Sequence, residues 1–204
     1  MLSIGLRGEL STSLFLPDGT LLCSQTCDNH ITNAGIKSVC DLIAGITPLS
    51  YRYIQIGRGG ESYEQLVDGE SGLPIYDLEG HPVMGWVMQN VSDTDTELFA
   101  AYAETGNLVQ AVQNGVYQMT AVFQIPLDVP ISEAGVFAGP AGMVPKMLAK
   151  QVFSNTVKMW QARRDATKSV VTGTFVQLQI DWKIFFGRDP QYESLYDPDI
   201  DIIS

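Results

Sequence analysis

Residues 174–186 read TFVQLQIDWKIFF, and this stretch decides the fold. Its apolar side chains fall on alternate residues, namely Val176, Leu178, Ile180, Trp182, Ile184 and Phe186, with Gln177, Gln179, Asp181 and Lys183 between them. A period of two is typical of a β-strand with one buried face. At about 3.3 Å per residue the strand would be roughly 43 Å long, which is long for a globular sheet.

The same alternation recurs elsewhere, most clearly in residues 117–125, where Tyr, Met, Ala, Phe and Ile occupy every second position. Shorter strands are predicted at residues 51–56, 83–89, 98–103, 131–138, 147–153 and 169–171. At the N-terminal end, Pro17-Asp18-Gly19 separates two apolar runs, and proline and glycine favour the backbone angles of a tight turn. We therefore expect an N-terminal β-hairpin.

One segment has helical spacing. Thr32 is a capping residue, Ile36, Val39, Cys40 and Ile43 follow at helical intervals, and Gly45 then Pro48 are stop signals. The pattern predicts a helix over about residues 32–45 that packs its apolar stripe on a sheet. The sequence thus predicts a mainly β fold: an antiparallel β-sandwich with one packed helix and extended loops in residues 1–186, followed by an extended acidic C-terminal arm at 187–204.

Composition narrows the possible partners. Of 204 residues 45% are hydrophobic and 17% are charged, which favours a packed globular chain. The net charge of −11 argues against nucleic acid and an anionic membrane surface as partners. The start of the chain has no apolar run long enough for a signal peptide, so we expect synthesis in a cytosol.

Charge is distributed unevenly along the chain. Residues 59–145 contain no Lys or Arg, whereas residues 146–188 hold most of the bases. The split is either an accident of composition or a source of attraction between the faces of stacked subunits. The basic pair Arg163-Arg164 is interpreted as a solvated loop or a contact for an acidic neighbour, and not as a DNA site.

Residue types that carry chemistry form no convincing set. Cys23, Cys27 and Cys40 favour buried thiols over disulfides, and zinc is disfavoured because only His30 lies near them in sequence. Neither histidine, His30 nor His81, belongs to a nucleophile motif. We predict no enzyme activity, no cofactor and no catalytic residues.

Two acidic runs have the spacing of oxygen ligands for a hard cation. These are Asp93, Asp95 and Glu97, and Asp197, Asp199 and Asp201. Both lack the glycine and the bidentate glutamate of an EF-hand loop. Solvated acidic loops explain both runs, with calcium as the lesser alternative.

Glu133 is the one acid in an unusual place. It shares strand parity with Ile131 and Phe137, so it points to the core if they do. An inward carboxylate must be neutral, paired or hydrogen-bonded to backbone donors. We favour a structural carboxylate at a strand end over a catalytic acid.

The C-terminal segment combines acidic with large apolar side chains, the latter being Tyr192, Leu195, Tyr196, Ile200, Ile202 and Ile203. A terminus this apolar reduces solubility unless it is covered. We expect these residues to form an interface with a neighbouring subunit, through a strand added at residues 200–202.

Several short stretches resemble a known family. They are Ile31-Thr32-Asn33-Ala34-Gly35, residues 53–59 (YIQIGRG), residues 131–137 (ISEAGVF) with 147–153 (MLAKQVF), and the closing residues 182–186 (WKIFF). Together they resemble tailed-bacteriophage virion proteins of the tail-fibre, tail-collar or baseplate-periphery type. The resemblance covers roughly residues 28–186, and the stretch from Gly60 to Gly115 is longer than the family pattern.

The resemblance implies a non-enzymatic subunit that builds or attaches part of the tail, in the virion, after synthesis in the host bacterial cytoplasm. Its expected partners are copies of itself and other tail or neck proteins, with the acidic segment from Glu61 to Glu79 as a second contact. The alternative is a receptor- or carbohydrate-binding module at the tail tip that stacks sugar on Trp86, Tyr102 or Trp160, although core packing is the simpler interpretation of Trp86. A glycan depolymerase ranks third.

Overall fold

A long curled sheet and two helices form the body of the protein. The computed structural model describes residues 5–46, 50–105, 108–113, 115–140, 147–167 and 175–187. The elements are β1 (Gly5–Phe15), β2 (Leu21–Ile31), α1 (Asn33–Ile43), β3 (Tyr53–Gly57), β4 (Glu61–Gln65), β5 (Met84–Met88), β6 (Ala101–Thr105), β7 (Val109–Gln113), β8 (Val116–Pro126), β9 (Glu133–Phe137), β10 (Met147–Val152), α2 (Thr156–Thr167) and β11 (Phe175–Gly187).

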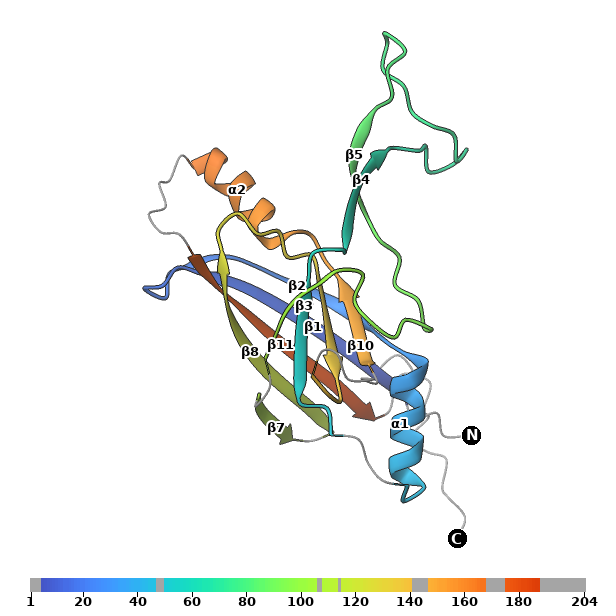
Figure 1. The fold of residues 1–204 in the computed structure, drawn as a ribbon, viewed down its shortest axis with the longest axis vertical. Helices are drawn as coiled ribbons and strands as arrows, with labels where there is room; N and C mark the ends of the chain where they lie inside the picture. The colour runs from blue at the N-terminus through green and yellow to red at the C-terminus, as the bar shows by residue number, and fades with distance from the viewer. Residues whose placement is uncertain are drawn as a thin grey trace, which may run out of the picture.

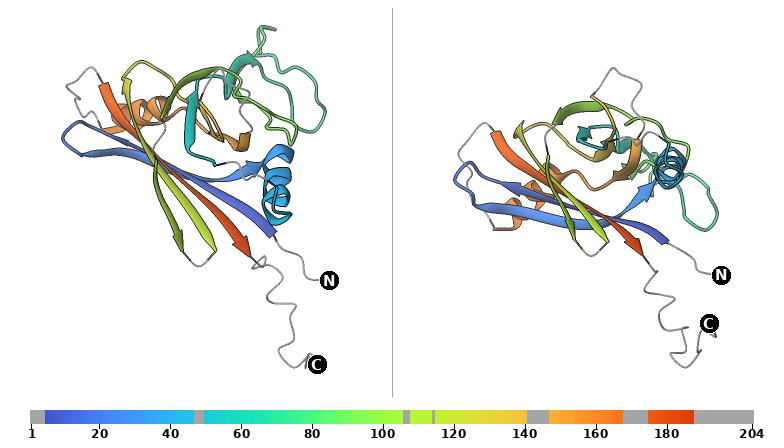
Figure 2. Two further views of the ribbon diagram at one scale, coloured as in Figure 1. Left: turned by 60° about the horizontal axis from the view of Figure 1, so that its bottom comes forward. Right: turned by 90° about the horizontal axis from the view of Figure 1, so that it is seen from below.

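The main sheet has nine strands in the order β6-β3-β9-β10-β2-β1-β11-β8-β7, with antiparallel neighbours. The sheet curls so that its two halves enclose one core (Figure 2). A hydrogen bond from the hydroxyl of Tyr117 in β8 to the carbonyl of Tyr51 just before β3 joins the halves at 2.9 Å. The mainly β class is confirmed, and the two facing layers belong to one continuous sheet that passes through β2.

The strand predicted at residues 174–186 is β11, at the centre of one half of the sheet. It pairs with β1 from Gly5 to Phe15 and with β8 along its length. Its alternation holds from Val176 to Ile184, where every second side chain is buried. Each such side chain contributes about 1.5–3 kcal/mol relative to leaving it in water. Phe186 departs from the pattern and is 41% exposed.

Helix α1 begins where the capping signal placed it. The hydroxyl of Thr32 accepts a hydrogen bond from the N–H of Gly35 at 3.0 Å and donates one to the carbonyl of Met147 in β10. The predicted buried stripe is wrong, because Ile36 and Ile43 are exposed. Small residues face the sheet instead, and a Cβ on Gly35 would lie 2.3 Å from the carbonyl oxygen of Leu148.

Helix α2 was not expected from the sequence, which predicted a single helix and a loop at Arg163-Arg164. Among its described side chains, Val157 and Trp160 are the buried apolar ones, and its amphipathic signal is weak. Asn155 caps it by accepting a hydrogen bond from the N–H of Lys158 at 3.0 Å. Tertiary packing against β1 and β2 therefore compensates for a poor helical pattern.

Two further strands were missed. Neither β4 nor the short edge strand β7 is among the strands predicted from the sequence. The strand predicted at 169–171 lies outside the described residues, as do all six predicted interface residues of the C-terminal segment. Within the described ranges, no helix is both long and apolar enough to cross a membrane.

The close contact between α1 and β10 leads to a first prediction. Gly35→Ala should destabilise the protein by about 1–3 kcal/mol, because the new methyl group meets a backbone oxygen that cannot rotate away. Urea denaturation would measure the free energy of unfolding. Gly69→Ala is the control, since nothing lies within 4 Å of its Cβ position; equal effects of the two changes would contradict the packing argument.

Candidate functional site

The carboxylate of Glu133 lies at the start of β9 and is completely buried. Its Oε1 accepts hydrogen bonds from the N–H of Gly59 at 2.9 Å and of Ala100 at 2.8 Å, and its Oε2 accepts one from the N–H of Phe99 at 2.9 Å. The side chain points inward, as its strand parity predicted, and its oxygens are satisfied by backbone donors. These donors come from two segments about forty residues apart in sequence.

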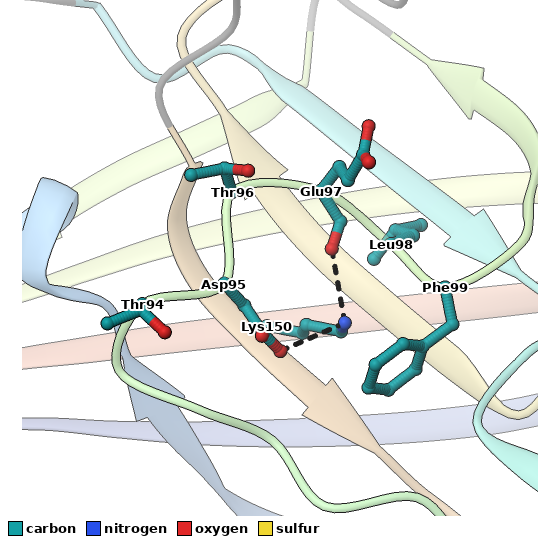
Figure 3. Close-up of a pocket in the computed structure, with 7 residues that line it drawn as sticks. All are labelled: Thr94, Asp95, Thr96, Glu97, Leu98, Phe99 and Lys150. Carbon is teal, nitrogen blue, oxygen red and sulfur yellow. Dashed lines mark hydrogen bonds and ion pairs between the residues drawn. The ribbon is translucent and has the colours of Figure 1, made fainter.

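Lys150 in β10 supplies a buried positive charge beside this carboxylate. Its Nζ lies 3.1 Å from Asp95 Oδ2, 3.1 Å from the carbonyl oxygen of Glu97 and 3.9 Å from Glu133 Oε2. It also sits 3.2 Å from the centre of the Phe99 ring, in a cation–π contact. Figure 3 shows the aspartate and the carbonyl directed at the ammonium group. Buried ions persist when they are paired and hydrogen-bonded in this way.

A pocket of about 340 Å³ lies over this cluster, lined by Thr94, Asp95, Thr96, Glu97, Leu98, Phe99 and Lys150. The donors of Lys150 are directed at oxygens and a ring of the protein itself. The arrangement favours fixing two loops in place over transforming a substrate.

Glu133, Lys150 and Asp95, which we call the buried cluster, hold in place the two ends of the long segment that connects β3 to β6. We call these two ends its roots. Its outgoing root passes through Gly59, and its returning root runs through Asp93 to Ala100. The returning root is held further by the carbonyl of Asp93, which accepts a hydrogen bond from the N–H of Asn33 at 2.8 Å, and by a contact between the Asp93 carboxylate and His30. The two roots meet where Gln89 N–H donates to the carbonyl of Gly60 at 2.8 Å.

Residues 61–88 project beyond these roots, and we call them the arm. Figure 1 shows the arm standing away from the curled sheet, with β4 and β5 as its stem. One face of the stem carries Tyr63, Met84, Trp86 and Met88, whose exposed fractions lie between 43% and 59%. Farther out, Val67, Leu73, Tyr76 and Leu78 are also exposed. The arm therefore presents apolar and aromatic surface that the described body does not cover.

Two aspartates order the far part of the arm. The N–H of Ser71 and its hydroxyl donate to Asp68, and these bonds hold the pKa of that carboxyl below its usual value. The N–H of His81, and then that of Glu79, do the same for the pKa of Asp77. The ligand atoms of Asp77, Glu79 and His81 lie within 4.8 Å of one another, but all three are exposed and nothing else there indicates a metal.

The three aromatic residues considered for sugar stacking lie in different environments. Trp160 is 3% exposed and belongs to the core, so it cannot serve as a platform. Tyr102 is half-buried, with the Arg58 guanidinium 5.3 Å from the ring centre. The interpretation of Trp86 as a core residue is wrong, because it is 55% exposed and pairs with Tyr63 at 5.4 Å between ring centres.

The other candidate residues are scattered. All three cysteines are free thiols, but only Cys23 is buried; Cys27 is half-buried, and the predicted burial is wrong for Cys40, which is exposed. Burial, with the Asp28 charge, raises the pKa of Cys27 to about 11. The expectation that Asp95 belongs to a solvated loop is wrong, because its carboxylate is paired with the Lys150 ammonium. That ammonium occupies the place that a bound cation would need. The second acidic run lies outside the described residues. The sequence analysis missed Lys150. The sign that could have revealed it is the presence of a lysine within the otherwise mostly apolar run of residues 147–153.

The buried cluster yields a second prediction. Glu133→Ala should cost about 3–5 kcal/mol of folding free energy, because Lys150 and three backbone N–H groups lose their partner inside the protein. Glu133→Gln keeps one acceptor oxygen and should cost less. Glu64→Ala on the exposed stem should change stability by no more than about 0.5 kcal/mol. A stable Glu133→Ala protein that has lost an enzymatic activity would reverse the structural interpretation.

The arm yields a third prediction, on pH. Hydrogen bonds to the carboxylate depress the pKa of Asp77 in the folded chain. The stability that Asp77 gives the turn is therefore present above its unfolded pKa of about 3.9, and it is lost as the pH falls through its lower folded pKa. A carbon-detected NMR titration should give a lower midpoint for Asp77 in the protein than in an unstructured peptide of residues 75–83. Equal midpoints would contradict the turn geometry.

Comparison with known proteins adds no relative from which a role could be transferred. No family model, no curated protein and no solved structure matches this chain. The resemblance to tail proteins therefore stays a prediction based on short motifs. Any functional argument has to start from the arm and the buried cluster that holds its roots.

Proposed function

We propose that this chain is a non-enzymatic structural subunit of a tailed-phage virion. It would build or attach part of the tail, in the baseplate, the fibre or the collar and neck, through protein–protein interfaces. The observation that carries the proposal is the arm, whose large apolar side chains stand exposed on a stem with fixed roots. Exposed apolar surface of this extent is typical of interaction sites.

The chemistry of the arm suits a protein partner. Aromatic residues and methionine are enriched at the centres of interfaces, and the stem face consists of Tyr63, Trp86, Met84 and Met88. Covering such surface gains about 25 cal/mol for each Å² removed from water. Because the roots are held by buried bonds, the stem loses little freedom when it docks, and the cost of ordering it is low.

The proposed partners follow from the same argument and from the family resemblance. They are copies of the chain and other tail or neck proteins, with no role for nucleic acid or membrane in a chain of net charge −11. The chain would be made in the host bacterial cytoplasm and end in the virion. The apolar residues of the C-terminal segment, which the sequence analysis favoured as an interface, remain a prediction.

One observation favours a second candidate function, a carbohydrate-binding module at the tail tip. Tyr63 and Trp86 are both more than half exposed, with an angle of 56° between the ring planes. Exposed aromatic faces are able to stack on sugar rings. Binding of the intact chain to a glycan array, abolished by Trp86→Ala, would favour this function over assembly.

Excision of the arm gives the fourth prediction. Residues 61–88 can be replaced by two glycines because Gly60 and Gln89 already touch. The shortened chain should keep a melting temperature close to that of the parent but fail to enter phage particles, as measured by mass spectrometry of purified virions. The same assay on a chain that ends at Gly187 tests the C-terminal interface.

Two results would contradict different parts of the proposal. If the full chain is absent from purified particles of the phage that carries its gene, the virion assignment is wrong. If the shortened chain enters particles at the parental level, the arm is not the interface. A cryo-electron map of the particle would then locate the contacts that do exist.

A further inference from the structure

The stem of the arm is a sheet of only two strands, so each strand has an outer edge. Among the described residues, no strand pairs with the outer edge of either β4 or β5. Such an edge presents backbone N–H and C=O groups with which another chain can pair. Natural proteins therefore protect exposed edges with charged side chains, proline or a bulge.

The two edges of the stem differ in this protection. β4 (ESYEQ) carries Glu61 and Glu64, and charge of this kind is a common protection of an edge strand. β5 (MGWVM) contains no charged residue and no proline, and its register with β4 is unbroken. The outer edge of β5 is therefore open to the addition of a strand, whereas the outer edge of β4 is protected.

The hydrogen bonds of the stem determine which backbone groups of β5 point outward. Gln89 and Gly60 form a hydrogen-bonded pair just below the stem, the N–H of Gln89 donating to the carbonyl of Gly60. Hydrogen-bonded and non-hydrogen-bonded pairs alternate along an antiparallel ladder, so the outward groups fall on every second residue of β5. They belong to Met84, Trp86 and Met88.

The same three residues place their side chains on the exposed apolar face of the stem. Met84, Trp86 and Met88 are between 43% and 55% exposed. A strand added beside β5 would set every second side chain next to this face. The added strand would thus gain backbone hydrogen bonds and apolar contacts from one edge, the combination on which recognition by strand addition depends.

The charge of the arm selects the occupant of this edge. The arm has six acids and no Lys or Arg. Among the described residues, Glu61 alone of these acids has a Lys or Arg partner, because Lys158 lies 3.6 Å from its carboxylate. A strand that carries Lys or Arg is attracted to the other acids, whereas a second copy brings an arm of the same charge and is repelled. Those other acids are all exposed, and they are Glu64, Asp68, Glu70, Asp77 and Glu79.

We propose that β5 accepts a strand from a different protein, in which Lys or Arg alternates with apolar residues. The apolar side chains of that strand share a face with Trp86, and its bases share the opposite face with Glu64. β4 and the added strand lie two strand spacings apart, about 10 Å, which is near the screening length in physiological salt. The inference rests on the proposed function and deepens it, since it makes the partner of the arm another protein and not a copy.

The test titrates the full-length, isotope-labelled chain with an octapeptide in which lysine alternates with valine, followed by NMR. The amide signals of Met84, Trp86 and Met88 should shift most, and hydrogen exchange of these N–H groups should slow because they become donors. An octapeptide that alternates glutamate with valine should bind about tenfold or more weakly. Added salt should weaken binding of the lysine peptide.

Proline variants test whether the backbone edge is used. Trp86→Pro removes an outward N–H without removing a bond to β4, and proline is tolerated at such edge positions. It should bind the lysine peptide about tenfold more weakly than Trp86→Ala, which loses the same side chain but keeps the N–H. Gln65→Pro makes the matching change on the edge of β4 and should bind like the parent. If Trp86→Pro does not fold, hydrogen exchange of the parent amides decides.

Four results would overturn the inference. They are absence of binding by the lysine peptide at millimolar concentration, equal binding of the glutamate peptide, equal binding by Trp86→Pro and Trp86→Ala, and loss of binding in a folded Gln65→Pro chain. Slowed exchange at Trp86 in the parent alone, increasing with its concentration, would show that a second copy is the occupant and would also overturn it.

These results are distinguishable from failure of the proposed function, because the peptide assay needs no virion. A chain whose β5 binds the lysine peptide as described but which is absent from particles supports the inference and removes the virion assignment. A chain that enters particles through its arm but does not bind the peptide leaves the function standing and removes the inference.

Discussion

The buried carboxylate of Glu133 is the constraint on which the arrangement of the molecule depends. An ion taken out of water costs several kcal/mol unless close partners replace the lost hydration. Here the replacements are backbone N–H groups at Gly59, Phe99 and Ala100, with Lys150 nearby. Because all of these must converge on one side chain, the chain has to leave β3 and return to β6 along fixed paths.

The glycines around the carboxylate make this convergence possible. A Cβ on Gly59 would lie 2.5 Å from that of Phe99, and a Cβ on Gly60 would lie 2.0 Å from the carbonyl oxygen of Ser132. Any side chain there would push the outgoing root away from β9. The protruding arm is thus a product of the same local packing, in which both roots are tied to the buried Glu133 while the stem stays exposed.

The sequence predicted the features whose cause is local. The alternation of β11, the cap at Thr32 and the inward parity of Glu133 can each be read within a dozen residues. Lys150 could not be understood in this way, because Asp95 and Glu97 reach it from a loop more than fifty residues earlier. Helix α2 was missed since its sequence has a weak amphipathic pattern, and the exposure of Trp86 depends on a stem that leaves the body.

The point at which the arm leaves the body has a consequence for how such a protein can diversify. The backbone hydrogen bond from Gln89 to Gly60 and the first pair of the stem, Glu61 with Met88, bring the two ends of a 28-residue segment together. Closing a longer or shorter loop at the same point changes the entropy only slowly with length. The position is therefore a natural graft point, where recombination could exchange one binding element for another while the sheet beneath keeps its fold.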